Sequence, residues 1–328
     1  MRLPDFQYLE PESIKEACSF LKDHGQGCRV IGGGTDLLPS MKQRIFKPES
    51  LVHLGGISNL NRMKFDKDAG LRIGPLVKLR SLETDPLVLE KYPVLSEATG
   101  QIGSIQLRQM GTVGGNLSLD TRCYYYNQSD FWRRCRPKCI KMGGEKCNAL
   151  GGGKKCFAVF SGDLAPVLIA LDAKITLISS MGERTLLLND FYTGDGAMPF
   201  ALSPEEIMTD IEIPPIPKDA FTCYLKYRIR RSIDFPIASV AATLTVEGRE
   251  KICRGLKVVI GAVGAKPSVV EGLGELMKGK RMESSLIEKA SDLAFQTAKP
   301  VPNTASSPAY RKRMIKVFVE SALTQALG

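Results

Sequence analysis

Two glycine-rich stretches, far apart in the sequence, limit what this chain of 328 residues can fold into. The first, CRVIGGGTDLLP, runs from a short apolar strand directly into three glycines, Gly32 to Gly34. Adjacent glycines leave the backbone free to adopt positive φ and let a pyrophosphate approach the main-chain NH groups. The GxGxxG spacing of Rossmann folds is absent. The stretch therefore indicates either a diphosphate loop of another fold or a simple glycine turn.

The second stretch, IGSIQLRQMGTVGGNLSLD, combines bare backbone with small polar side chains. Its compact turn contains Thr112, Gly114, Gly115 and Asn116. Two loops of this kind can hold one extended ligand between them, because each supplies main-chain donors to a different part of it. The pair indicates an extended ligand that contains a diphosphate.

A cysteine-rich segment follows the second stretch. It holds five of the nine cysteines, which are Cys123, Cys135, Cys139, Cys147 and Cys156. No segment has the length of a signal peptide's apolar run or approaches the roughly 20 apolar residues of a membrane span, so we expect a cytoplasmic protein without a membrane contact. In a reducing compartment, clustered cysteines indicate metal binding or redox chemistry rather than disulfides.

The spacing of these cysteines is irregular, with 11, 3, 7 and 8 residues between successive members. It matches neither the paired CxxC of a zinc ribbon nor the usual ferredoxin runs. Four irregularly spaced thiolates suit an iron-sulfur cluster held by one wrapped loop, while a structural zinc site and free thiols remain as alternatives.

Most of the formal charge of +10 belongs to the same segment, which contains nine basic and only two acidic residues between Thr121 and Phe157. Such cations stabilise an anionic cluster or dock an acidic electron carrier. The alternatives are a solvated basic loop and a zinc-containing module that binds nucleic acid.

A change of composition at EIPPIPKDA marks the expected domain boundary, because Pro214, Pro215 and Pro217 interrupt regular elements. We therefore predict two domains, residues 1–216 and 217–328. In the second, FTCYLKYRIR, ASVAATLTVEG and ICRGLKVVIGAVG indicate a three-stranded meander, and helices are expected over 284–297 and 309–327. Strands backed by helices form an α+β unit.

Three segments carry a resemblance to a known family. In order, GGGTDLLP, IGSIQLRQMGTVGGNL and SGDLAPVLIALDA resemble the FAD-binding medium subunit of the xanthine dehydrogenase and carbon monoxide dehydrogenase family of molybdenum hydroxylases. The resemblance covers nearly the whole chain and continues in KYRIRRSIDFPIASVAA. It implies an α+β fold, in which a vanillyl-alcohol-oxidase (PCMH)-type FAD-binding domain of two subdomains precedes a C-terminal domain of the CO dehydrogenase flavoprotein type.

The resemblance also implies which residues contact FAD, bound without a covalent link. The diphosphate-binding segment falls on Ile31, Gly32, Gly33, Gly34, Thr35, Asp36 and Leu37, and the second FAD loop on Thr112, Gly115 and Asn116. Asp163 matches an acid that hydrogen-bonds the ribityl or adenosine part. Ile207 and Met208 match apolar residues near the flavin or adenine, and Lys226 matches a basic residue that faces the cofactor.

The cysteine segment is an insertion relative to ordinary members of that family, because Asn116 and Asp163 are 47 positions apart. It resembles the insertion of the 4-hydroxybenzoyl-CoA reductase branch, whose FAD-binding beta subunit carries an additional 4Fe-4S cluster. Within an insertion loop at 118–160, that pattern implies four cluster ligands, Cys123, Cys139, Cys147 and Cys156. Cys135 is a fifth cysteine that the pattern does not require. It takes the place of Cys139 as a ligand if the match between this insertion and the reductase pattern is shifted by four residues.

The function implied is that of an electron-transfer subunit of a molybdenum-dependent 4-hydroxybenzoyl-CoA reductase, which forms benzoyl-CoA in anaerobic aromatic degradation. Electrons would enter from ferredoxin or a similar acidic carrier at the 4Fe-4S cluster and pass to FAD. They would leave through a 2Fe-2S small subunit toward a molybdopterin-binding large subunit, in a heterohexamer built as a dimer of heterotrimers. The first alternative is a xanthine- or aldehyde-type dehydrogenase in which FAD reduces NAD. No residue of this chain is expected to be catalytic, and no nucleic acid is expected as a partner.

Overall fold

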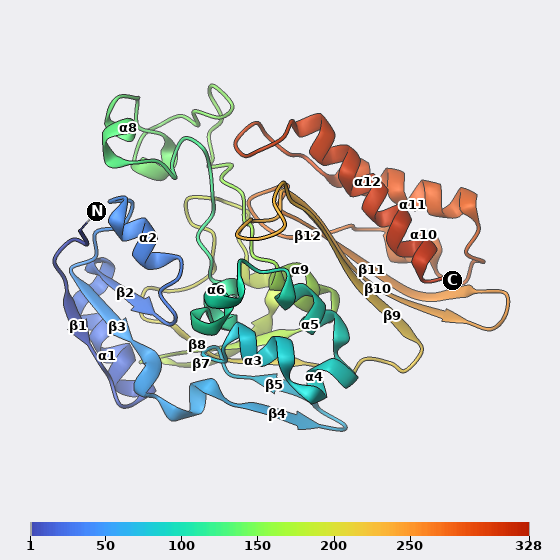
Figure 1. The fold of residues 1–328 in the computed structure, drawn as a ribbon, viewed down its shortest axis with the longest axis horizontal. Coiled ribbons are helices and arrows are strands. Elements are labelled where there is room, and N and C mark those ends of the chain that lie inside the picture. Colours follow the sequence, from blue (N-terminus) through green and yellow to red (C-terminus); the bar gives the residue numbers. More distant parts are fainter. Residues whose placement is uncertain (1, 328) are drawn as a thin grey trace.

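The computed structural model describes residues 2–327. Their strands form three sheets, one in each of three units, and Figure 1 shows the N-terminal unit at one end of the long axis and the C-terminal unit at the other. Short 3-10 helices join these elements at Gly25–Gly27, Leu54–Gly56, Ser58–Asn61, Ile140–Met142 and Leu188–Phe191. No helix in this part of the chain is both long and apolar enough to cross a membrane.

The N-terminal unit is a parallel sheet in the order β1-β3-β2, made of β1 (Gln7–Leu9), β3 (Ser50–His53) and β2 (Cys28–Ile31). Helix α1 (Ile14–His24) packs against it and buries Cys18 in the core of this unit. The helix begins at Ser13, whose hydroxyl accepts a hydrogen bond from the main-chain NH of Glu16. Strand β2 ends at the first glycine stretch, which leads directly into α2 (Leu37–Lys42).

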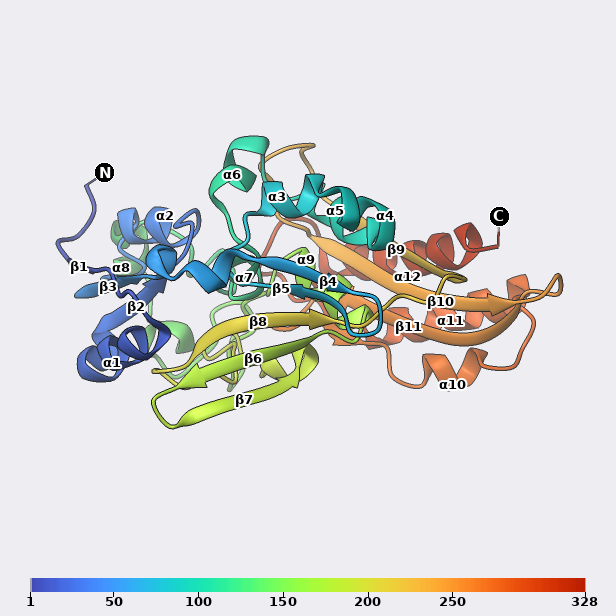
Figure 2. The ribbon, with the colours of Figure 1, turned by 90° about the horizontal axis from the view of Figure 1, so that it is seen from below.

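The central unit is a five-stranded antiparallel sheet in the order β4-β5-β8-β6-β7. Its strands are β4 (Met63–Asp66), β5 (Gly70–Ile73), β6 (Lys174–Ser179), β7 (Gly182–Leu187) and β8 (Ile207–Ile213). Figure 2 shows helices α3, α4 and α5 together on one side of this sheet. The helices of this unit are α3 (Leu79–Thr84), α4 (Pro86–Lys91), α5 (Pro93–Gly100), α6 (Ile105–Met110), α7 (Val113–Leu117) and α9 (Leu164–Ala170).

Helix α9 joins the central unit to the C-terminal unit. All seven of its residues are buried, and it contacts both α5 and the C-terminal strands. The largest hydrophobic core accordingly continues from this helix to Tyr224, Ala241 and Val259 of the C-terminal sheet. The two units therefore share one core.

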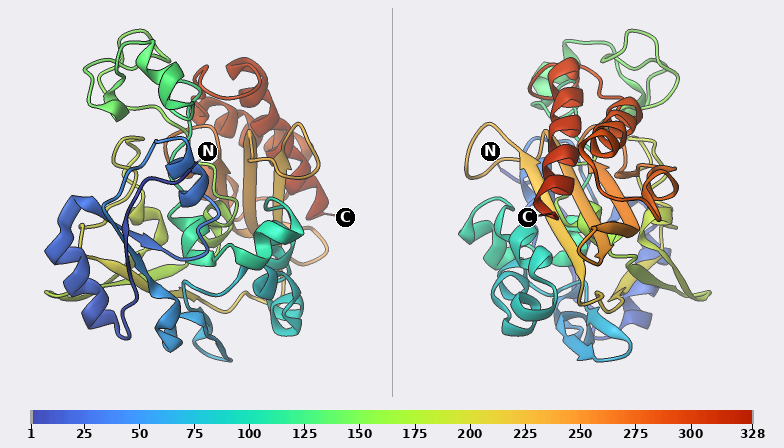
Figure 3. Two further views of the ribbon diagram at one scale, coloured as in Figure 1. Left: turned by 60° about the vertical axis from the view of Figure 1, so that its left-hand side comes forward. Right: turned by 90° about the vertical axis from the view of Figure 1, so that its right-hand side faces the viewer.

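The C-terminal unit contains the predicted meander of β9 (Ala220–Tyr227), β10 (Ala238–Glu247) and β11 (Ile252–Gly261). A two-residue strand that the sequence did not predict, β12 (Ser268–Val269), extends its edge. Helices α10 (Leu273–Met277), α11 (Ser284–Thr297) and α12 (Pro308–Gln325) pack on one face of this sheet, as Figure 3 shows. The predicted helix over 284–297 has the bounds of α11, and the one over 309–327 differs from α12 by one or two residues.

The cysteine segment leaves the central unit after α7 and returns before α9. It contains α8 (Asp130–Arg134) and projects above α2 as a separate lobe in Figure 1. Its two ends are held together where the main chains of Arg122 and Val159 exchange two hydrogen bonds of 2.7 Å. The segment is thus a loop that leaves and re-enters the central unit at neighbouring points, as expected of an insertion.

Candidate cofactor site

A cavity of about 750 Å³ lies where the three units meet. The N-terminal unit contributes the glycine stretch after β2, the central unit contributes the turn between α6 and α7, and the C-terminal unit contributes Asp234 and Phe235. The predicted FAD contacts that line it are Ile31, Gly32, Gly33, Gly34, Thr35, Asp36, Leu37, Thr112, Gly115, Asn116, Asp163, Ile207 and Met208. The fold therefore gathers residues from four distant segments around one space.

The two glycine-rich loops touch each other across one wall of this cavity. A Cβ atom on Gly33 would lie 1.9 Å from the carbonyl oxygen of Met110, so only glycine permits the contact. Gly34 has a φ of 69°, which glycine adopts without strain. The glycines thus serve the contact between the loops as well as any approach of a ligand.

Two of the residues predicted to contact FAD also stabilise the local main chain. The hydroxyl of Thr112 accepts a hydrogen bond of 3.1 Å from the NH of Gly115 and caps the short helix α7. The amide oxygen of Asn116 accepts a 3.0 Å bond from the NH of Leu164, at the start of α9. These side chains therefore hold the turn in shape beside the cavity.

Asp163 is the centre of a buried polar group. Lys226 Nζ and the hydroxyl of Tyr224 each lie 2.8 Å from its Oδ1. Burial raises the pKa of Asp163, and the neighbouring ammonium partly offsets this effect. Burial also lowers the pKa of Lys226. Lys226 is absent from the cavity lining, and its buried Nζ, besides contacting Asp163, donates to the carbonyl of Gln101.

Each acidic side chain that lines the cavity is paired with a cation. The pairs are Asp36 with Arg122, Asp120 with Lys141, Asp163 with Lys226, Glu206 with Arg184, and Asp234 with Arg230. Arg29, over the ring of Phe46, adds another cation to the lining. Because each carboxylate is neutralised by its cation, the lining acids do not repel an anionic ligand.

Sequence reasoning missed Asp120, Arg122 and Phe235 as lining residues. Asp120 ends the second glycine stretch and Arg122 directly precedes Cys123, so the junction of these two segments was the available signal. Phe235 comes from the loop between β9 and β10, and no local pattern connects it to this cavity. Its ring lies 4.4 Å from the guanidinium carbon of Arg122.

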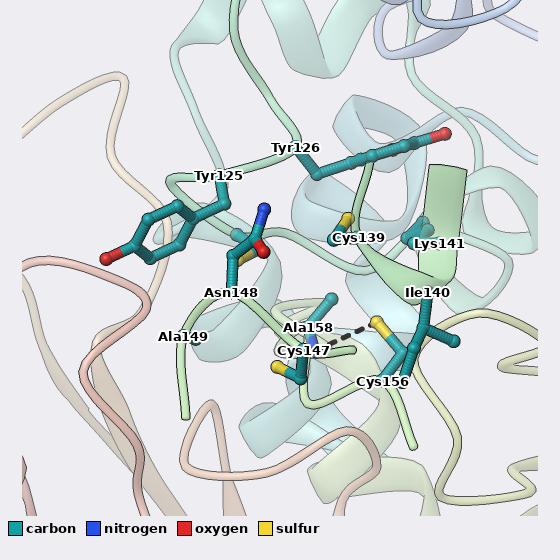
Figure 4. A pocket seen from close by; sticks show the side chains of 11 residues that line it. Tyr125, Tyr126, Cys139, Ile140, Lys141, Cys147, Asn148, Ala149, Cys156 and Ala158 are labelled. Carbon is teal, nitrogen blue, oxygen red and sulfur yellow. Dashed lines mark hydrogen bonds between the residues drawn. The ribbon is translucent and has the colours of Figure 1, made fainter. Parts of the chain in front are cut away.

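The four predicted cluster ligands line a second, smaller pocket. Cys123, Cys139, Cys147 and Cys156 surround it together with Tyr125, Tyr126 and Lys141, and Figure 4 shows three of these cysteines around the same space. Burial raises the pKa of Cys123 to about 11, with smaller contributions from the other three thiols. Cys135 is exposed and lies outside this pocket.

The donors that this pocket offers are four cysteine thiols. Within residues 2–327 no three cysteine, histidine or acidic side chains converge closely enough for a single metal ion. The four cysteines thus line one pocket without forming a site for a single ion.

Buried cations attach the cysteine segment to the cavity walls. Arg133 donates a 2.9 Å hydrogen bond to the carbonyl of Arg44, just beyond α2. Lys141, whose side chain is 5% exposed, lies 2.7 Å from Asp120. The cysteine segment is thus joined to the chain beyond α2 and to Asp120 of the cavity lining.

Family models match both halves of the chain. Residues 4–216 match the FAD binding domain in molybdopterin dehydrogenase, and residues 223–326 match the CO dehydrogenase flavoprotein C-terminal domain. The aldehyde oxidoreductase FAD-binding subunit PaoB of Escherichia coli is 31% identical over 315 residues, which cover 92% of this chain and 93% of that protein. The glyceraldehyde dehydrogenase medium chain of Sulfolobus acidocaldarius is 27% identical, with 98% of each chain covered.

A solved structure has the same fold along its full length. Reconstituted CO dehydrogenase from Oligotropha carboxidovorans superposes with a TM-score of 0.82 at 25% identity, covering all of this chain and 99% of that one. This agreement confirms the predicted FAD-binding domain and C-terminal domain. The chain belongs to the FAD-binding medium subunits of the xanthine dehydrogenase and CO dehydrogenase family of molybdenum hydroxylases.

Proposed function

We propose that this chain is an electron-transfer subunit that holds FAD in the large cavity and a 4Fe-4S cluster on Cys123, Cys139, Cys147 and Cys156. One observation carries the proposal: the pocket lined by these cysteines adjoins the cavity, because Arg122 of the cavity lining is bonded directly to Cys123. Bound FAD exchanges one or two electrons and so links carriers of both kinds. The chain's own residues hold the two groups close together.

The partners that we propose are a 2Fe-2S small subunit and a molybdopterin-binding large subunit, in a cytoplasmic dimer of heterotrimers. Ferredoxin or a similar acidic carrier would supply electrons at the cysteine segment. The segment's charge supports this step, since its exposed cations are Arg134, Arg136, Lys138, Lys146, Lys154 and Lys155. A positively charged face accelerates the encounter with an acidic protein.

The substrate that we propose for the complex is 4-hydroxybenzoyl-CoA, reduced to benzoyl-CoA. Support for it is the arrangement of the insertion, in which the four cysteines of that pattern line one pocket and the fifth, Cys135, lies outside. The substrate itself would bind to the large subunit.

An aldehyde-type dehydrogenase is the second candidate. The 31% identity to an aldehyde oxidoreductase subunit favours it. The two candidates differ in the electron partner of FAD, so the purified complex should be mixed separately with reduced ferredoxin and with NAD plus an aldehyde. Flavin reduction by ferredoxin together with conversion of 4-hydroxybenzoyl-CoA supports the first, whereas NADH formation supports the second.

Metal analysis combined with a visible spectrum tests the cofactor proposal. We expect one FAD per chain, released into solution by denaturation. We also expect about four iron atoms and an equal amount of sulfide per chain. Zinc in place of iron would refute the cluster, and a protein without flavin absorbance would refute the proposal as a whole.

A further inference from the structure

One asparagine of the C-terminal unit binds the main chain directly after the first and the last cysteine of the small pocket. The carbonyl of Asn303 accepts a 2.8 Å hydrogen bond from the NH of Tyr124, and its side-chain NH2 group donates to the carbonyl of Phe157. These two partners directly follow Cys123 and Cys156. Asn303 is fully buried and lies in the loop between α11 and α12, which reaches toward the cysteine segment (Figure 1).

The position of Asn303 is itself fixed by the loop around it. Its own NH donates a 2.8 Å hydrogen bond to the carbonyl of Val301. The same carbonyl accepts a 2.9 Å bond from the guanidinium of Arg311, a fully buried side chain that also donates to the carbonyls of Ile237 and Ala262. The amide of Asn303 is therefore presented from a rigid support, as precise positioning of a neighbouring group requires.

The peptide group that Asn303 binds also contacts a sulfur. A peptide is planar, so the direction of the Phe157 carbonyl fixes the direction of the Ala158 NH in the same peptide. This NH donates to Sγ of Cys156 over 3.5 Å, the bond drawn as a dashed line in Figure 4. Because hydrogen bonds in a chain polarise one another, a bond accepted by the carbonyl strengthens the NH as a donor. Asn303 thus both orients and strengthens the donor to Cys156.

A hydrogen bond to a ligand sulfur affects the redox behaviour of an iron-sulfur cluster. Such bonds are among the factors that set the reduction potential of a cluster. Reduction adds negative charge, part of which the ligand sulfurs carry, so an NH donor stabilises the reduced form more than the oxidised one. A well-aligned donor therefore makes the cluster easier to reduce.

We infer that Asn303 is a positioning residue for the proposed cluster, which holds the Phe157–Ala158 peptide so that its NH stabilises the Cys156 thiolate and raises the reduction potential. This inference rests on the proposed function and extends the metal site to a residue of the C-terminal unit, 146 positions from Phe157. Asn303 acts through the peptide, and its main-chain bond to Tyr124 keeps the loop against the segment.

The test is a potentiometric titration of the cluster in the complete complex, followed by EPR. Asn303→Leu keeps a branched side chain without a donor, and Asn303→Ala removes the donor without adding an apolar group; both keep the main-chain carbonyl that binds Tyr124. We expect reduction of the cluster to become about tenfold less favourable in both variants, a fall of about 60 mV for a one-electron carrier. The FAD content and the flavin potential should equal those of the wild type.

Asn61→Leu is the matched control, because it makes the same substitution at an exposed asparagine outside both pocket linings. Its cluster potential should equal that of the wild type. Loss of iron from both Asn303 variants with full FAD content would also support the positioning role, since the ligand after which Asn303 binds would then no longer be held.

The contrary outcomes are distinct. A wild-type protein without iron would refute the proposed function and this inference with it. An unchanged cluster potential in both Asn303 variants would refute this inference alone. A fall confined to Asn303→Leu would assign the effect to packing, and joint loss of iron and FAD would assign Asn303 to the stability of the whole fold; either result would overturn the positioning role.

Discussion

At the scale of single residues, the site depends on groups whose neighbours decide their role. Gly33 shows this, because its lack of a side chain lets one loop reach the main chain of the other. Asp163 shows it too, because Lys226 and Tyr224 make a buried carboxylate tolerable at the edge of the cavity. The residue type alone specifies neither role.

Gly33→Ala should separate the two glycine loops. Its Cβ would lie 1.9 Å from the main-chain oxygen of Met110, and backbone cannot turn aside as a flexible side chain does. We expect a loss of about 1–3 kcal/mol in the free energy of unfolding, typical of an overpacked site, together with reduced FAD content. Gly255→Ala is the control, since its Cβ would meet no atom within 4 Å. Denaturant unfolding of FAD-free protein provides the measurement, and equal stability of the two variants would contradict the loop contact.

Lys226→Met should destabilise the protein in a pH-dependent way. Removing one partner of a buried ion pair typically costs about 3–5 kcal/mol, because the other charge is left uncompensated. Burial already raises the pKa of Asp163, and loss of the ammonium raises it further. A raised pKa means that the folded state retains a proton which the unfolded state releases above its ordinary pKa near 4. The difference from wild type should therefore be smallest near pH 4 and grow toward pH 7. A difference that is constant between these pH values would show that Asp163 does not carry the effect.

At the scale of elements, the cysteine segment is a loop without a large core of its own. Its aromatic residues pack locally, with the rings of Tyr125 and Trp132 6.5 Å apart and Arg136 over Trp132. This agrees with a packing role for these aromatic side chains. The conformation of this segment therefore depends on its contacts with the FAD-binding domain, and on the proposed cluster when it is bound.

Substitution of single cysteines tests the ligand set of this element. Cys123→Ser, Cys139→Ser, Cys147→Ser and Cys156→Ser should each lose most of the iron while FAD remains, because each removes one of four corner ligands. Cys135→Ser should keep its iron, since Cys135 is exposed and outside the pocket. Iron and sulfide should be measured under anaerobic conditions. Loss of iron from Cys135→Ser with retention in Cys139→Ser would move the second ligand four residues upstream.

At the scale of the whole molecule, the cavity exists only because three units meet. Its lining combines the β2–α2 turn, the α6–α7 turn and the β9–β10 loop, which no single domain contains. Unlike the cavity lining, the excess positive charge comes mainly from one part of the chain, the cysteine segment, which projects from the molecule in Figure 1. The cavity depends on all three units, whereas most of the positive charge belongs to one segment.

Reduction by an acidic carrier should depend strongly on ionic strength. Raising salt shortens the Debye length and weakens steering by the exposed lysines, so the second-order rate should fall about tenfold or more between low and high salt. Replacing Lys154 and Lys155 by glutamate should reproduce much of this loss at low salt. Lys289→Glu and Lys312→Glu, on the C-terminal helices α11 and α12, are the charge-matched control. Stopped-flow flavin reduction measures the rate, and a rate independent of salt would exclude docking on this segment.

Local sequence determined the elements of this protein well. The bounds of α11 and the three strands of the meander follow from periodicity and turn residues, which act over a few positions. The family resemblance added the FAD-binding type of the first domain, the interpretation of the cysteine segment as an insertion, and the candidate FAD residues. The boundary between residues 216 and 217 remains a prediction.

Tertiary structure alone decided how distant segments meet. The pairing of β5 with β8 joins Leu71 to Ile213, and no local pattern encodes such a partner. The family resemblance likewise predicted Lys226 as a residue facing the cofactor, whereas the fold pairs it with Asp163 and leaves it out of the cavity lining. It also brings Asp36, Arg122 and Phe235 together from three separate segments. Local propensity acts through neighbours in the chain, but burial and charge pairing are settled only when the units pack.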